Sequence, residues 1–140
     1  MTQGAAGGDI VFAEAALARG ARLRLLLPLD ENEFVARSIL PAEDGVAWRD
    51  RFDALLRRIG AAGCSEAPVA LGDLADGDDP FVRGNRWLLD EAFAAASPQA
   101  PQVVCLWDGR GGDGPGGTAH LVAEARRRGG DVVVIDPANL

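Results

Sequence analysis

Residues 103–135 read VVCLWDGRGGDGPGGTAHLVAEARRRGGDVVVI, and this is the most informative segment of the chain. Two short apolar runs, 103–107 and 132–135, predict buried strands, and residues 118–128 between them predict a helix. The glycine pair that follows the helix favours its end, because glycine readily adopts the left-handed backbone found after helix C-termini. Strand, helix and strand in this order predict a parallel βαβ unit.

The segments before this unit also alternate between helix and strand. In chain order they predict a helix over 9–19 with Asp9 as its N-cap, a strand over 23–27, helices over 31–39 and 46–59, a strand over 68–71, and a helix beginning at Asp79-Pro80. The alternation predicts an α/β fold, a single three-layer Rossmann-like domain over residues 1–140 with a mostly parallel sheet.

The predicted core follows from the same patterns. We expect Leu25, Val104 and Val133 to be inaccessible to solvent, because inner parallel strands are covered on both faces. Trp48 begins an apolar stripe at helical spacing, which continues through Phe52, Leu55, Leu56 and Ile59. This stripe is expected to pack on the sheet.

Composition excludes several classes of protein. Hydrophobic residues make up 48% of the 140 residues, as in ordinary globular domains, and the net charge of −7 argues against nucleic acid and anionic membranes as partners. The two cysteines, Cys64 and Cys105, lie in no zinc-ligand or disulfide pattern. Without a signal peptide or a long apolar run, the chain is predicted to be cytoplasmic.

The predicted ligand edge lies after the strands. Asp30, Asp73, Asp108 and Asp136 each follow a candidate strand closely. Ligands of open parallel sheets bind outside the carboxyl ends of the strands, and carboxylates there can accept hydrogen bonds from ribose hydroxyls. Aspartate is also a common cap and turn residue, which is the alternative interpretation.

The glycine-rich loop 109–117 offers backbone N–H groups to an anion beside a helix N-terminus. It lacks the lysine of a P-loop, but Gly112, Gly114 and Gly117 match the spacing GxGxxG, with Asp136 after the next strand. A plain surface connection is the alternative. His120, the single histidine, is interpreted as a solvated helix residue, and no nucleophile with a base and acid partner is evident.

Three segments carry a family resemblance: GGDIVFAEAALARGARLRLLLPLDENEFVARSI at 7–39, GNRWLLDEAF at 84–93, and VCLWDG followed by GPGGTAHLVAEARRRGGDVVVID within 104–136. They resemble Rossmann-like nucleotide-sensor domains found beside bacterial cyclases and tetratricopeptide proteins. These domains are similar to the SLOG superfamily, which includes lonely-guy phosphoribohydrolases and the ligand-sensing region of TRPM channels. Nucleoside deoxyribosyltransferases are similar too.

The resemblance implies roles for particular residues. Gly116, Gly117 and Thr118 would form a phosphate or ribose cradle, and Asp108 and Gly109 would open the pocket. Asn85 and Arg86 would reach into it, Arg86 supplying positive charge. The enzymes of the superfamily carry a glutamate three positions after the threonine, where this chain has Leu121. Binding without catalysis is therefore expected.

The resemblance also implies a binding or sensing domain for a nucleotide-derived ligand, such as ADP-ribose or NAD, with no cofactor specified. The alternatives are an N-glycosidic-bond hydrolase or transferase and a degenerate interaction domain. Domains of this kind begin with a strand and a helix, including a first glycine-rich phosphate loop, before the segment that begins here near Gly7, so the chain is expected to be the C-terminal part of a longer domain. An exposed sheet edge would then favour a homo-oligomer or docking to an effector or an N-terminal segment.

Overall fold

A computed structural model describes residues 1–110 and 114–140. The chain divides into two compact units, Met1–Asp73 and Leu74–Leu140. Both units combine helices with parallel strands, so the α/β class is confirmed. In the described part of the chain, the strands form two separate parallel pairs, and the single three-layer sheet stays a prediction. None of the described helices is long and apolar enough to span a membrane.

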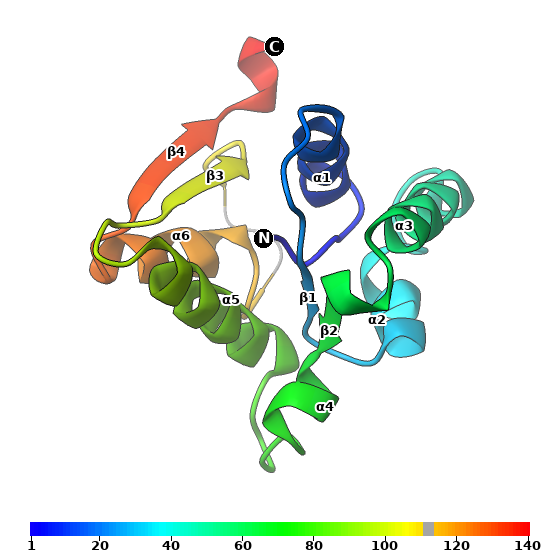
Figure 1. The fold of residues 1–140 in the computed structure, drawn as a ribbon, viewed down its shortest axis with the longest axis horizontal. Helices are drawn as coiled ribbons and strands as arrows, with labels where there is room; N and C mark the ends of the chain where they lie inside the picture. The colour runs from blue at the N-terminus through cyan, green and yellow to red at the C-terminus, as the bar shows by residue number, and fades with distance from the viewer. Residues whose placement is uncertain (111–113) are drawn as a thin grey trace. The chain divides into compact units, whose positions relative to one another are not determined.

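The first unit is built around β1 (Leu25–Leu27), whose three leucines are fully buried. Its other elements are α1 (Gly8–Ala18), α2 (Glu31–Ser38), α3 (Gly45–Ile59), the 3₁₀ helix η1 (Ala61–Gly63), β2 (Cys64–Glu66) and α4 (Ala67–Leu71). Strand β2 pairs in parallel with β1, and Thr2 forms a parallel bridge to Leu25. The segment before α1 therefore runs from this isolated bridge at Thr2 through residues 3–7, which include Gly4 and Gly7 (Figure 1).

The core of the first unit contains Phe34 and Phe52, whose ring centroids lie 5.9 Å apart. Phe52 and Leu55 are the buried members of the predicted apolar stripe on α3. Trp48 is only half-buried, and the guanidinium of Arg51 lies 4.2 Å from the centre of its ring. The stripe therefore begins at the edge of the core.

Two predictions for this unit were wrong. Residues 68–71 lie in helix α4 rather than a strand, because Pro68 fits the first turn of a helix and Gly72, at φ +78°, ends it. The strand lies just before, in β2, whose residues Cys-Ser-Glu show no apolar pattern. Asp9 is not the N-cap of α1 either, since Gly7 occupies that position.

Asp9 instead holds the turn that precedes α1. Its Oδ2 accepts hydrogen bonds from the N–H groups of Gly4, at 3.0 Å, and Ala5, at 3.3 Å. Withdrawal of the carboxylate from water raises the pKa of Asp9, and the hydrogen bonds from Thr2 and the turn offset this only in part.

This shift predicts a pH dependence of stability. Because the pKa of Asp9 is higher in the folded chain than in the unfolded one, its contribution favours folding when it is protonated and is lost as pH rises through the folded-state pKa. At pH values above the ordinary pKa of aspartate, the melting temperature should therefore fall less with rising pH in Asp9→Asn, which keeps an acceptor oxygen, than in the wild type. Calorimetric melts from about pH 3.5 to 7 measure this. Asp50→Asn, at an exposed position on α3, is the control, and equal pH profiles for wild type and Asp9→Asn would contradict the assignment.

The second unit begins with α5 (Pro80–Ala96), followed by β3 (Gln102–Leu106), α6 (Thr118–Arg127), β4 (Asp131–Ile135) and the 3₁₀ helix η2 (Pro137–Asn139). The predicted helix start at Asp79-Pro80 is confirmed, because Asp79 Oδ1 accepts from the N–H groups of Phe81 and Val82. The predicted βαβ unit is also confirmed: β3 and β4 are parallel, with Val104 opposite Val133.

Helices α5 and α6 lie on the same side of the β3–β4 pair (Figure 1). Cys105 on β3 is buried, as are Val122 and Ala125 on α6 and Leu89 on α5. Val104 precedes the buried Cys105 on β3 and is 41% exposed, whereas Val133 on β4 is 39% exposed and is followed by two further exposed residues, Val134 and Ile135. The predicted burial of both residues was therefore wrong. Side chains of successive strand residues point to opposite faces, and the helices cover only the face of β3 that carries Cys105, while residues 133–135 of β4 are exposed on both faces.

Candidate functional site

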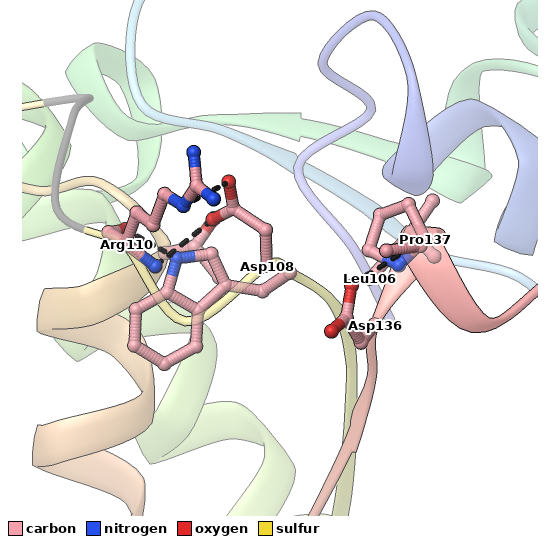
Figure 2. Close-up of a pocket in the computed structure, with 8 residues that line it drawn as sticks. Leu106, Asp108, Arg110, Asp136 and Pro137 are labelled. Atoms are coloured by element: carbon pink, nitrogen blue, oxygen red, sulfur yellow. Dashed lines mark hydrogen bonds and ion pairs between the residues drawn. The ribbon is translucent and has the colours of Figure 1, made fainter.

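A hollow of about 530 Å³ lies at the carboxyl ends of β3 and β4. Its lining comes from the ends of both strands, the start of α6 and the segment after β4. The residues are Leu106, Trp107, Asp108, Arg110, Thr118, Asp136, Pro137 and Ala138. Figure 2 shows Asp108 and Arg110 together at one end and Asp136 and Pro137 at the other. The volume is in the range of small-molecule sites.

The turn after β3 fixes Asp108. Its Oδ1 accepts from the Arg110 N–H at 2.9 Å, while the indole Nε1 of Trp107 donates to the Arg110 carbonyl at 2.7 Å. The Arg110 Nε lies 3.9 Å from Asp108 Oδ2, so cation and carboxylate adjoin at the rim. Gly109, at φ +78°, makes this turn possible.

Asp136 follows β4 directly, at the level of Trp107 in the strand register and one residue before the level of Asp108. The Trp107 N–H donates to the Ile135 carbonyl at 2.9 Å, which extends the strand ladder up to the two aspartates. The Oδ1 of Asp136 accepts from the Ala138 N–H at 2.9 Å and caps η2. Two carboxylates thus stand at the ends of two paired parallel strands.

The N-terminus of α6 forms a third side of the hollow. Thr118 is its first residue, and no side chain caps the helix at Gly117, whose backbone is extended. The positive end of the helix dipole and its first N–H groups favour an anion or a hydroxyl there. The hollow therefore combines two carboxylates and a guanidinium with an aromatic ring and a helix N-terminus.

The other residues named from the sequence lie apart from this lining. Gly116 packs against the first turn of α5, where an added Cβ would lie 2.6 Å from the Phe81 carbonyl carbon and 2.7 Å from the Val82 nitrogen. Asn85 is 3% exposed, and its Nδ2 donates to the Gly116 carbonyl. These contacts hold the loop against α5, and neither residue lines the hollow. Gly112 of the GxGxxG spacing lies outside the described residues.

Arg86 lines a different hollow, on the surface of α5 and α6. Its neighbours there are Asp90, Glu124, Arg127 and Arg128. Glu124 is bound by both Nε and Nη2 of Arg127, at 3.0 and 2.6 Å, and these hydrogen bonds lower its pKa. Arg86 and Glu124 are thus placed together on the helices, while the hollow at the strand ends is lined without them.

Sequence reasoning did not single out Trp107, Arg110 or Pro137 as site residues. Each is a near neighbour of an aspartate that was named, so the signal was their position beside Asp108 and Asp136 at the strand ends. Asp30, named from the same rule, serves instead as the N-cap of α2, where it accepts from the Glu33 N–H at 3.1 Å.

The cysteines offer no activated nucleophile. Burial, together with the nearby carboxylates of Glu66 and Glu31, raises the pKa of Cys64 to about 11, so it is a thiol at neutral pH. Cys105 is buried. Within residues 1–110 and 114–140, no group of three or more histidine, cysteine and acidic side chains could hold a metal ion. Comparison of the chain with protein families, curated proteins and solved structures finds no match.

Proposed function

We propose that the hollow at the ends of β3 and β4 binds a nucleotide-derived small molecule, with ADP-ribose or NAD as examples of the class. The observation that carries the proposal is the convergence of Asp108, Asp136 and Trp107 on one hollow beside the N-terminus of α6. Ligands of parallel α/β sheets bind at this edge.

Each part of such a ligand has a matching group. The half-exposed ring of Trp107 offers a stacking surface for a base. The carboxylates of Asp108 and Asp136 accept hydrogen bonds from ribose hydroxyls. The guanidinium of Arg110 and the N-terminus of α6 supply positive charge for a phosphate, and Arg110 also offsets the charge of the adjoining Asp108 carboxylate. A free inorganic anion fits less well, because two aspartates face the same space.

A thermal-shift screen tests the proposal. ADP-ribose, NAD, AMP and cyclic nucleotides are added to the whole chain, and a compound that binds only the folded state raises the melting temperature. Asp136→Asn should weaken binding of the best compound by about tenfold to a hundredfold, which corresponds to about 1.5–3 kcal/mol for a hydrogen bond to a charged group. The variant keeps the oxygen that caps η2, so its fold is preserved.

Glu124→Gln is the matched control, because Glu124 is held by Arg127 on the helix surface. It should bind as the wild type does. A screen in which no compound shifts the wild-type melting temperature would refute the proposal and favour an interaction domain.

We also expect no enzymatic release of base from AMP, NAD or deoxynucleosides. Transition states with oxocarbenium character need a positioned carboxylate, and Leu121 stands at the position of the glutamate of related enzymes. Chromatography of the incubated compounds measures free base. Sustained turnover that is lost in Glu124→Gln would overturn the binding interpretation and show that Glu124 acts as the missing carboxylate.

A further inference from the structure

Asn85 connects α5 to the loop and helix that border the hollow. Its Nδ2 lies 2.6 Å from the carbonyl oxygen of Gly116 and 3.1 Å from Nδ1 of His120. The residue is 3% exposed, so water does not replace these contacts. A buried amide with two such neighbours is expected to have a fixed orientation.

The chemistry of the three groups determines where the proton of neutral His120 lies. A carbonyl oxygen can only accept, so the amide atom beside Gly116 must be the NH₂ nitrogen. The same nitrogen faces His120 Nδ1 and can only donate to it, so Nδ1 must be the unprotonated ring nitrogen. The proton of the neutral ring is therefore on Nε2.

We propose that Asn85 is a positioning residue that fixes His120 as the Nε2–H tautomer and holds the turn that delivers Thr118 to the hollow. His120 is then a hydrogen-bond donor through Nε2 and does not act as a base there. Gly116, packed on the first turn of α5, is held by the same amide. The assignment of the tautomer does not depend on the proposed function, whereas the consequence for ligand binding rests on it.

The tautomer can be measured directly because His120 is the single histidine of the chain. Long-range ¹H–¹⁵N spectra of the ¹⁵N-labelled protein, at a pH about two units above the ordinary histidine pKa, distinguish protonated from unprotonated ring nitrogens. The expected result is a protonated Nε2 and an unprotonated Nδ1. A protonated Nδ1 in the wild type would overturn the proposal, even if every variant failed to fold.

Asn85→Asp provides the sharper test, because free histidine already favours Nε2–H. The ionised carboxylate introduced by this substitution can only accept, so it loses the hydrogen bond to the Gly116 carbonyl, and beside it the ring proton should move to Nδ1. Asn85→Ala removes the donor and should give a mixture of tautomers. Asn32→Asp makes the same change at an exposed position on α2 and should leave the spectrum unchanged. An unaltered Nε2–H form in Asn85→Asp would overturn the role of Asn85.

Binding of ADP-ribose tests the second half of the inference. Asn85→Ala should weaken it by about tenfold or more, because the turn before Thr118 loses its support and a misplaced group loses much of its contribution. Equal affinity in wild type and Asn85→Ala would overturn this half. If no nucleotide binds the wild type, the proposed function fails, while the spectra still decide the tautomer.

Discussion

Gly116→Ala is expected to lower the free energy of unfolding by about 2–5 kcal/mol. The backbone of Gly116 has φ +80°, a conformation that side chains disfavour. The added Cβ would also lie against Phe81 Cβ and the backbone of Phe81 and Val82, within the first turn of α5. A helix backbone cannot move aside as a flexible side chain can. The conformational strain at Gly116 and the steric overlap of the added Cβ therefore both lower the free energy of unfolding.

Gly114→Ala is the matched control. Gly114 lies in the same loop at φ +68°, but its added Cβ would meet no atom of the described residues within 4 Å. It should cost only the conformational strain, about 1–2 kcal/mol. Urea unfolding followed by circular dichroism measures both variants. Equal losses for the two would show that the packing of Gly116 on α5 contributes nothing to stability.

Phe52→Ala is expected to cost about 3–5 kcal/mol of unfolding free energy. Phe52 is fully buried on α3, with its ring against Phe34 and close to Gly4, whose added Cβ would meet it at 3.3 Å. Truncation removes the buried ring and leaves a cavity between β1, α2 and α3. The same denaturation experiment measures the loss.

Val46→Ala and Trp48→Ala on the same helix provide the comparison. Val46 is 73% exposed, so its truncation should change stability by less than about 0.5 kcal/mol. Trp48 is half-buried with Arg51 stacked on it, so its loss should fall between the other two. A Phe52→Ala loss no larger than that of Val46→Ala would refute the assignment of Phe52 to the core.

The candidate site was predictable from the sequence in its outline. Asp108 and Asp136 each follow an apolar run, and parallel pairing of the runs places both at one sheet edge. Thr118 was expected at the start of the helix between them. The lining added by Trp107 and Arg110 was not predicted, because it depends on the turn in which the Trp107 indole binds the Arg110 carbonyl.

Local structure with strong residue patterns could be predicted before the fold was known. The 3.6-residue stripe of α3, the Asp79-Pro80 start of α5 and the apolar runs of β3 and β4 all express preferences that act within one turn or one strand. These interactions join residues close in sequence, so pattern alone reveals them.

Which strand faces are buried, and which side chains contact one another, depends on how distant segments pack. The apolar runs of β3 and β4 do not indicate whether one face or both faces of the strands are covered, and Val104 and Val133 proved exposed. Glycine-rich composition likewise could not separate a ligand cradle from a packing contact, and Gly116 meets α5, a segment more than 30 positions earlier in the chain. Asn85 binds the Gly116 carbonyl and His120 only because folding brings α5 against α6. Such contacts depend on the packing of distant segments, which no local pattern encodes.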